Sequence, residues 1–296
     1  MPRLLIIKLG AAGDVVRTTS LLHLFREFET HWITAPENGP LLRIAQVTRL
    51  YTSPDQLVPG SNFDKVICLE DDAALLHPIL SRITFKELFG AFLDEGLEVR
   101  YTEDSAPWYD MGVASRHGLA KADKIKLANR KSYQEIIFAC LGRRFQGERY
   151  FLPDSLPVTN LRGDIAISRQ AGARWPAKNW HGFEALAEEL SKTFVVNFLP
   201  KREDILEHVS DVRNHRFLVT PDSLPMHLAL GLGIPSAAIF TCTSPWEIHD
   251  YGILSKVVSP NLDRYFYSKG NIPEARQSIS IESVYQLVSR QMEFRA

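Results

Sequence analysis

The sequence predicts an α/β protein of two doubly wound domains, each with a mostly parallel sheet covered by helices. Three observations support this fold class. The chain has 296 residues, enough for two domains of about 150 residues each. Branched apolar runs alternate with segments of helical periodicity. The alternation stops at 151–163, a stretch with two prolines and a terminal glycine, and then restarts. We therefore expect domains at 1–155 and 156–296, facing one another across a cleft, with ligands bound at the carboxyl ends of the strands.

The first half begins with a short apolar run, Leu4–Ile7, typical of a strand buried on both faces. Leu21, Leu24, Phe25 and Phe28 follow at helical spacing, which completes a strand-turn-helix unit. Further strands are expected at 31–36 and 64–70. The polar stretch 98–131 predicts an irregular surface segment near the cleft, and 131–142 predicts a helix with Gly142 as its C-terminal cap.

The second half repeats the alternation. Its expected elements are strands at 164–168, 193–199 and 235–240, an amphipathic helix through Phe183, Leu186, Ala187 and Leu190, a helix over 223–232, and a last helix through Ile281, Val284, Tyr285 and Val288. In two-domain chains of this type, such a last helix can pack back across the first domain.

Composition excludes several classes of protein. The 34 basic and 35 acidic side chains nearly balance, so no overall basic field draws the chain onto nucleic acid. Cys68, Cys140 and Cys242 lie far apart without a CxxC pair, which argues against a disulfide framework and a cysteine zinc cluster. The apolar run before Gly10 is too short for a signal peptide, and no run of about 18 apolar residues occurs. We expect a cytoplasmic protein, with at most peripheral contact at the inner face of a membrane.

The loop "LGAAGDVV" after the first strand lacks both phosphate-binding motifs. It has no G-x-G-x-x-G and no G-K-[ST], which disfavours a dinucleotide-dependent oxidoreductase. Asp14 lies where the loop enters the helix, so it either caps the helix and offsets its macrodipole, or points into the cleft as a general base. Arg17 and His23 are nearby candidates for acceptor contact, although a solvated helix face is the simpler interpretation of both.

A second constellation lies in the other half. Asp222 and Ser223 stand at a predicted helix start with Pro225 in the first turn, and Lys178 precedes another helix. Free N–H groups at helix starts bind diphosphates, and a lysine adds a point charge. Taken singly, Lys178 fits a solvated loop lysine. His227 likewise fits a histidine satisfied on a half-buried helix, and Trp175 and Trp180 fit plain packing.

Three segments, 4–25, 172–190 and 221–252, occur in an order that resembles glycosyltransferase family 9, the bacterial ADP-heptose:lipopolysaccharide heptosyltransferases and their relatives. The first is similar to the family's opening strand, small-residue loop and G-D. The second resembles its glycine–alanine loop with a lysine and tryptophan, and the third its D-S-G-P-M-H-L-A…G-x-P…F-G-x-T-x-P…Y-G stretch. A weaker likeness at 132–142 extends the resemblance over nearly the whole chain.

The resemblance implies the GT-B fold, two facing Rossmann-like domains, and a role in lipopolysaccharide biosynthesis or other cell-surface glycan assembly. It implies that Asp14 is the general base of an inverting transfer and that Lys178 contacts the donor diphosphate. Asp222, with the backbone N–H groups of Ser223 and Leu224, would hold donor sugar and phosphate. Glu203 falls where the family tends to have an acidic residue near the donor nucleoside. Thr243 matches the family's threonine, without an assigned role.

The first domain would then be the acceptor side and the second the nucleotide-sugar side. The donor would be ADP-heptose or a related ADP-sugar, and the acceptor a glycan, a lipid-linked glycan or a protein. No resident cofactor is expected, and no clustered Asp-x-Asp or His set suggests a metal.

The sequence departs from the family pattern at three places: Leu224 replaces the glycine of D-S-G, Leu199-Pro200 replaces a glycine pair, and Thr241 replaces the glycine after "AIF". These departures keep two alternatives open. One is a GT-B transferase that uses another nucleotide sugar, and the other is a non-catalytic protein that binds nucleotide sugars.

Overall fold

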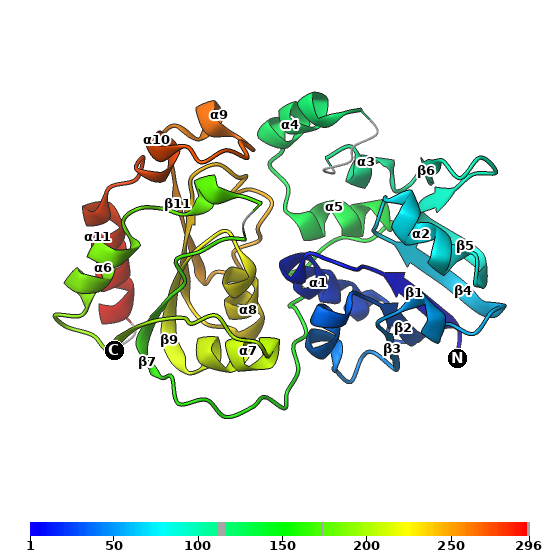
Figure 1. The fold of residues 1–296 in the computed structure, drawn as a ribbon, viewed down its shortest axis with the longest axis horizontal. Coiled ribbons are helices and arrows are strands. Elements are labelled where there is room, and N and C mark those ends of the chain that lie inside the picture. The colour runs from blue at the N-terminus through cyan, green and yellow to red at the C-terminus, as the bar shows by residue number, and fades with distance from the viewer. Residues whose placement is uncertain (112–116, 173, 295–296) are drawn as a thin grey trace. The chain divides into compact units, whose positions relative to one another are not determined.

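The computed structural model describes residues 1–111, 117–172 and 174–294. The chain divides into two compact units, Met1–Asp154 and Ser155–Ala296, each built on its own sheet (Figure 1).

The N-terminal unit is built on a six-stranded sheet of order β3-β2-β1-β4-β5-β6. Its strands are β1 (Arg3–Ile7), β2 (Glu29–Ile33), β3 (Arg49–Tyr51), β4 (Ser61–Cys68), β5 (Ile83–Leu93) and β6 (Val99–Tyr101). All neighbouring strands pair in parallel except β5 and β6, which are antiparallel. The order reverses at β1, whose neighbours are β2 and β4.

Helices cover both faces of this sheet. The helices of this unit are α1 (Ala12–Thr18), α2 (Ala73–Leu80), α3 (Ala106–Tyr109), α4 (Leu119–Ala128) and α5 (Tyr133–Cys140), with 3₁₀ helices at Thr19–Leu24, Pro36–Leu42 and Pro54–Gln56. α1 and α5 pack on one face of the sheet and α2 on the other. Alternate residues of β1 divide between the two cores, because side chains of a strand point to opposite faces. Leu4 and Ile6 pack in the core that contains α1 and α5, while Leu5 and Ile7 pack in the core that contains α2.

A glycine allows the close pairing of β4 with β5. Gly90 has φ +114°, and a Cβ at this position would lie 1.9 Å from the carbonyl oxygen of Cys68. Only glycine fits both the backbone conformation and the space. It therefore fixes the carboxyl end of β4, which carries part of the site described below.

The C-terminal unit has a five-stranded, wholly parallel sheet of order β11-β10-β9-β7-β8. Its strands are β7 (Gly163–Ile167), β8 (Val196–Phe198), β9 (His215–Pro221), β10 (Ser236–Phe240) and β11 (Leu254–Val258). Its helices are α6 (Phe183–Leu190), α7 (Ile205–Arg213), α8 (Leu224–Leu232), α9 (Leu262–Tyr265), α10 (Pro273–Arg276) and α11 (Ile281–Glu293), with a 3₁₀ turn at Pro176–Lys178. Here the order reverses between β7 and β9.

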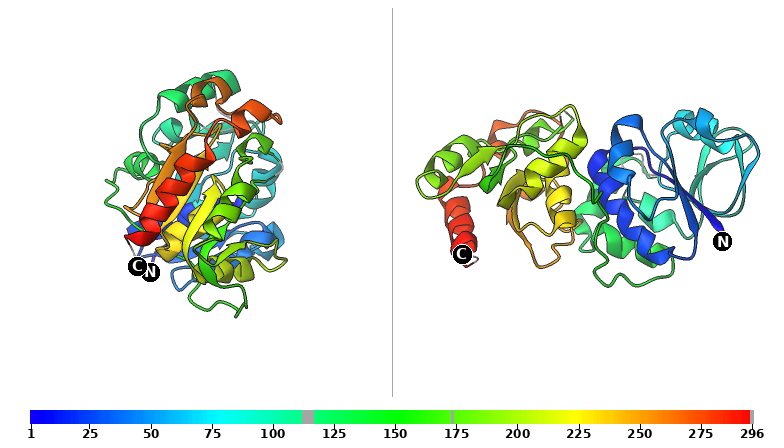
Figure 2. Two further views of the ribbon diagram at one scale, coloured as in Figure 1. Left: turned by 90° about the vertical axis from the view of Figure 1, so that its left-hand side faces the viewer. Right: turned by 90° about the horizontal axis from the view of Figure 1, so that it is seen from below.

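The last helix buries its apolar face within its own unit. α11 lies beside α6 along one face of the sheet (Figures 1 and 2). Val284, Val288 and Met292 join the buried cluster that also holds Phe183 and Leu186 of α6. The expected periodicity of this helix is thus explained by contacts inside the C-terminal unit.

Most predicted elements are confirmed: the first strand, the strands near 31–36, 64–70, 164–168 and 235–240, and the helices at 131–142, 183–190, 223–232 and 281–293. Gly142 has φ +68°, as a helix C-terminus favours. Two predictions were wrong. The apolar residues at 21–28 do not extend an α-helix, because α1 ends at Thr18 and a 3₁₀ segment follows. Among its described residues, 98–131 contains β6, α3 and α4 and is not irregular throughout.

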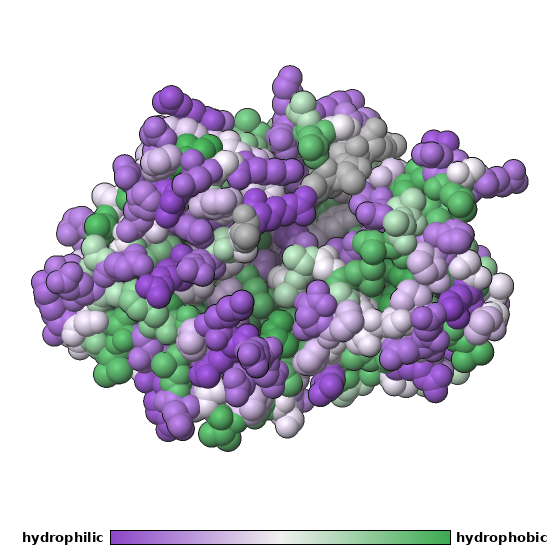
Figure 3. Space-filling model, in the orientation of Figure 1, coloured by the Kyte–Doolittle hydropathy of each residue, from purple (hydrophilic) through white to green (hydrophobic). Residues whose placement is uncertain are grey.

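No helix among the described residues is both long and apolar enough to cross a membrane. On the face drawn in Figure 3, polar residues surround small apolar patches in both units.

Candidate functional site

Candidate sites lie at the carboxyl ends of the strands where each sheet changes direction. In doubly wound folds, connections leave to opposite faces at such a point, and ligands bind in the crevice beyond the strand ends. In the N-terminal unit the point lies at β1 and β4, followed by the opening loop and Glu70. In the C-terminal unit it lies at β7 and β9, followed by Lys178 and Asp222.

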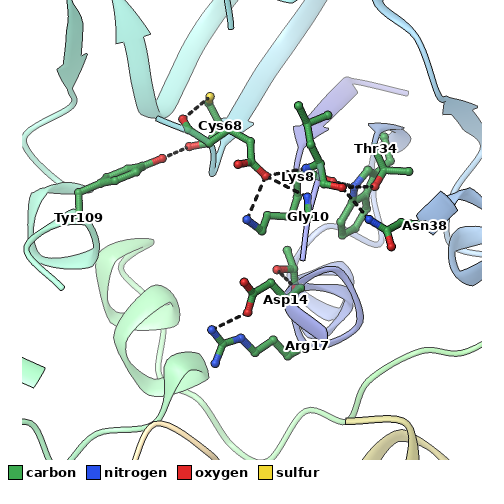
Figure 4. A network of polar contacts seen from close by, with 12 residues as sticks. Lys8, Gly10, Asp14, Arg17, Thr34, Asn38, Cys68 and Tyr109 are labelled. Atoms are coloured by element: carbon green, nitrogen blue, oxygen red, sulfur yellow. Dashed lines mark hydrogen bonds and ion pairs between the residues drawn. The ribbon is translucent and has the colours of Figure 1, made fainter. Parts of the chain in front are cut away.

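Glu70 holds the opening loop of the N-terminal unit. Its Oε1 accepts hydrogen bonds from the backbone amides of Leu9, at 2.6 Å, and Gly10, at 3.3 Å, and lies 3.0 Å from Nζ of Lys8 (Figure 4). These two amides already have a carboxylate as their partner, so they do not form a phosphate cradle.

Further contacts fix both strand ends around this carboxylate. Asn38 Nδ2 donates to the carbonyl of Leu9 at 2.7 Å, and the Tyr109 hydroxyl donates to the carbonyl of Cys68 at 2.6 Å (Figure 4). Glu70 was not identified from the sequence. Its position just after β4, the buried strand that pairs with β1, could have indicated it, because polar residues at such strand ends lie at the expected site.

Asp14 lies in the first turn of α1, at its third residue. Ala11 occupies the cap position, so the interpretation of Asp14 as the capping residue is wrong, although its charge still suits the positive end of the helix. Its Oδ1 lies 2.7 Å from Nη2 of Arg17 (Figure 4). The carboxylate is 36% exposed and the Arg17 side chain 15%, so the acid group remains open to solvent.

Arg17 does not occupy a solvated helix face. Its guanidinium lies 3.9 Å from the ring centroid of Tyr133 in α5, and the Tyr133 hydroxyl is 2.6 Å from Oγ1 of Thr18. Stacking on an aromatic ring removes rotational freedom from arginine. Arg17 therefore fixes the orientation of Asp14.

Three side chains from separate segments meet in the C-terminal unit. Lys178 follows β7, Asp222 follows β9 and Thr243 follows β10. Lys178 Nζ lies 2.7 Å from Oδ2 of Asp222 and 3.0 Å from its backbone carbonyl oxygen. Thr243 Oγ1 donates to the same Oδ2 at 2.8 Å. Thr243 thus supports Asp222, a role that the sequence did not reveal.

The ion pair is mostly shielded from water. The Lys178 and Asp222 side chains are 13% and 15% exposed. Burial alone would raise the pKa of Asp222, but the Lys178 ammonium, with His227 and the Thr243 hydroxyl, lowers it to about 2. Lys178 is therefore not a solvated loop lysine.

The start of α8 lies directly after Asp222. Ser223 is the cap residue and Leu224 the first helical residue, with Pro225 in the first turn as predicted. Leu224 has a helical backbone in place of the family's glycine, so the departure changes the side chain beside the site without straining the chain.

Glu203 is exposed in the loop between β8 and α7. No hydrogen bond between described residues connects it with Lys178 or Asp222. The preceding Arg202 anchors the loop, since its Nε and Nη2 lie 2.7 Å and 3.1 Å from the carboxylate oxygens of buried Asp211.

Of the remaining candidates, Trp180 has a packing role, while Trp175 and His227 also adjoin the ion pair: the ring centroid of Trp175 is 5.7 Å from Nζ of Lys178, and His227 helps to lower the pKa of Asp222. Trp180 is buried and donates to the carbonyl of Ile279 at 3.0 Å, and His227 is buried in α8. Trp175 packs edge to face against Tyr267, at a centroid distance of 5.6 Å. Within the described part of the chain, no three His, Cys, Asp or Glu side chains gather in a group that could hold a metal ion.

We expect Asp222→Asn to lower the free energy of unfolding by about 2 kcal/mol at pH 7, because the folded-state pKa of about 2 lies well below the ordinary value of 3.8. A carboxylate with a lowered pKa stabilises the fold above its unfolded-state pKa. The difference between wild type and variant should therefore persist at neutral pH and shrink as the pH falls from about 4 toward 2. Urea unfolding at pH 7 and pH 3 measures both values. Asp154→Asn, at an exposed position, is the control; an equal loss there, or no loss at Asp222, would contradict the assignment.

The family model of glycosyltransferase family 9 (heptosyltransferase) matches residues 175–267. The match covers Lys178, Glu203, Asp222 and Thr243, and confirms the resemblance in the segment that was most specific. No curated protein matches the chain in sequence.

Solved structures match over nearly the whole chain. The E. coli ADP-heptose lps heptosyltransferase II is 15% identical with a TM-score of 0.65, and 99% of each chain is covered. E. coli heptosyltransferase WaaC, solved with ADP-2-deoxy-2-fluoro heptose, is 15% identical with a TM-score of 0.56, over 98% of this chain and 99% of that one. The dodecameric iron-containing heptosyltransferase TibC, from enterotoxigenic E. coli H10407 and solved with ADP-D-beta-D-heptose, is 12% identical with a TM-score of 0.57, over 98% and 76%.

At these identities the structures establish the fold, and the sequence match supports glycosyltransferase activity. Residues 175–267 therefore carry the sequence pattern of glycosyltransferase family 9, and the whole chain has the GT-B fold of its heptosyltransferases.

Proposed function

We propose that the protein is an inverting, metal-independent glycosyltransferase that moves a heptose or related sugar from an ADP-sugar to an acceptor hydroxyl. Lys178, Asp222 and the amides of Ser223 and Leu224 bind the donor, and Asp14 is the general base. The setting is cytoplasmic assembly of a cell-surface glycan, with a glycan, lipid-linked or protein acceptor and peripheral contact with the membrane.

The observation that carries the proposal is the Lys178–Asp222–Thr243 cluster. It lies at the carboxyl ends of β7, β9 and β10 and inside the segment that matches the family. Two of the similar structures were solved with an ADP-sugar or its analogue. Glu203, in the loop after β8, is the proposed contact to the donor nucleoside.

The chemistry is a single displacement. The acceptor oxygen forms a bond to the anomeric carbon while the bond from that carbon to the diphosphate breaks, and the configuration inverts. Asp14 accepts the acceptor's proton. The bond's electron pair leaves on the diphosphate, whose growing charge is stabilised by the Lys178 ammonium and backbone N–H groups.

Two observations bear on the alternatives. Leu224 and Leu199-Pro200 alter the surroundings of the donor, which favours a nucleotide other than ADP as the second candidate. The partly exposed Asp14 carboxylate, held in place by Arg17, argues for turnover and against a protein that only binds nucleotide sugars.

Thermal unfolding with a panel of nucleotide sugars and nucleotides tests the donor. A ligand that binds only the folded state raises the melting temperature by mass action. We expect concentration-dependent stabilisation by ADP-heptose and ADP that exceeds stabilisation by UDP, GDP and CDP and their sugars. Selective stabilisation by another nucleotide would assign a different donor, and no stabilisation by any of them would contradict the proposal.

Asp14→Asn should keep donor affinity and reduce turnover by about 10² to 10⁴-fold, since the amide cannot accept the proton. Donor Kd and kcat measure the two effects separately. Asp64→Asn is a matched control, because Asp64 is an ion-paired aspartate of the same unit, 33% exposed and 2.7 Å from Nζ of Lys86. Turnover near that of the control would rule Asp14 out as the base.

Treatment with EDTA followed by gel filtration should leave kcat and KM unchanged, because the proposed charge stabilisation uses Lys178 and amides. Iron and zinc content before and after treatment is measured by mass spectrometry. Activity lost on treatment and restored only by added metal would overturn metal independence; the iron-containing TibC makes this measurement necessary.

A further inference from the structure

The turn that carries Lys178 is too short to define its own geometry. It is a single 3₁₀ turn, Pro176–Lys178, and its cap residue Trp175 makes no side-chain capping bond. Short 3₁₀ turns have poor hydrogen-bond geometry and little stability of their own. The position of Lys178 must therefore come from contacts with other parts of the unit.

Two side chains hold the backbone on either side of Lys178. Thr241 Oγ1 donates to the carbonyl of Ala177 at 2.7 Å. Arg276 Nε donates to the carbonyl of Asn179 at 2.7 Å. The two donors come from different elements, Thr241 from the end of β10 and Arg276 from the end of α10.

The Thr241 contact is fully protected from solvent. Its side chain is 0% exposed, and so is Ala177. A buried hydroxyl without a partner is unfavourable, so the bond must be kept for the turn and the strand end to pack together. Thr241 thereby connects the turn that carries Lys178 with the end of β10. Two residues further along the same segment, Thr243 binds the Asp222 carboxylate.

We infer that Thr241 and Arg276 are positioning residues that place the Lys178 ammonium for a nucleoside diphosphate. The inference rests on the proposed function of Lys178. Both act through the backbone of the turn, on the carbonyls of Ala177 and Asn179. Thr241 stands where the resembled family has glycine, which has no side-chain donor, and Arg276 lies outside the residues that match the family.

A role in packing alone gives a different expectation. Loss of packing would lower the stability of the fold and reduce the affinities for ADP and for adenosine by similar factors. Loss of positioning would weaken the contact with phosphate and leave the contacts with the nucleoside unchanged. Comparing ADP with adenosine therefore separates the two roles.

Isothermal titration with ADP and with adenosine tests the inference in Thr241→Val, which keeps the shape and removes the hydroxyl. We expect ADP to bind about three- to tenfold more weakly, as for the loss of one hydrogen bond, with adenosine affinity unchanged. Thr241→Ser restores the donor and should recover most of the ADP affinity. Ser236→Ala is the matched control, because Ser236 is a buried donor to a backbone carbonyl, that of Ile234 at 2.9 Å, at the opposite end of β10.

Arg276→Met should give a similar loss that is selective for ADP. In the double variant Thr241→Val/Arg276→Met, the fold loss of ADP affinity should be smaller than the product of the two single losses, because both residues act on one turn. Amide hydrogen exchange at 177–179, measured without ligand, should be faster in each single variant than in the Ser236→Ala control.

Normal ADP binding and normal exchange in Thr241→Val would overturn the inference, as would an equal loss of ADP and adenosine affinity. Failure of the wild-type protein to bind ADP or any other nucleotide would refute the proposed function, and the positioning role for a diphosphate with it. Faster exchange at 177–179 would then reveal only a structural clamp. The two failures are therefore distinguishable.

Discussion

An ion pair between a lysine and a carboxylate bridges the strand ends at the change of direction in each sheet. In the N-terminal unit Lys8 and Glu70 follow β1 and β4, 3.0 Å apart. In the C-terminal unit Lys178 and Asp222 follow β7 and β9, 2.7 Å apart. The backbone ladder pairs these strands up to their ends, where the Leu69 amide donates to the Ile7 carbonyl and the Ser168 amide to the Val219 carbonyl, each at 2.9 Å. Beyond these bonds the connections leave toward opposite faces, so each ion pair joins segments that the ladder no longer holds.

The two pairs differ in what else the carboxylate binds. Glu70 also accepts the amides of Leu9 and Gly10, so its charge is used to hold a loop. The Asp222 carboxylate also accepts a hydrogen bond from the Thr243 hydroxyl. In the described part of the C-terminal unit, it does not bind the backbone amides at the start of α8 in the way that Glu70 binds those of the opening loop. The Lys8–Glu70 pair thus fixes the loop that leads to Asp14. The Lys178–Asp222 pair holds an ammonium beside the start of α8. This use of Glu70 agrees with the sequence of the opening loop, which has neither G-x-G-x-x-G nor G-K-[ST].

Sequence predicted the elements whose patterns are local. β1 and β10 are continuous apolar runs, and α6 and α11 have clear helical periodicity. β5 was missed because its burial is mixed, with a run of exposed residues before a buried end. For the candidate site, motif order suggested Lys178, Asp222 and Ser223, and the structure brings Lys178 and Asp222 together and places Ser223 at the cap of α8. Thr241 and Glu70 were not, because each acts on a backbone group about sixty residues away in sequence, 64 for Thr241 and 60 or 61 for Glu70. Such contacts depend on how strand ends meet in the folded sheet.

The charge balance of the C-terminal unit explains why the placement of Lys178 is critical. The Lys178 ammonium has three N–H donors: one donates to the Asp222 carboxylate, whose negative charge balances that of the ammonium, and one donates to the backbone carbonyl of Asp222. At the start of α8, Pro225 has no N–H, and the amide of Met226 donates to Ser223. The first turn therefore presents the amides of Ser223 and Leu224. A diphosphate would meet one remaining ammonium donor and two amides in place of a broad positive field. With so few donors, affinity depends on the direction of each one, so a displacement of the turn at 176–178 would weaken the contact that Lys178 makes.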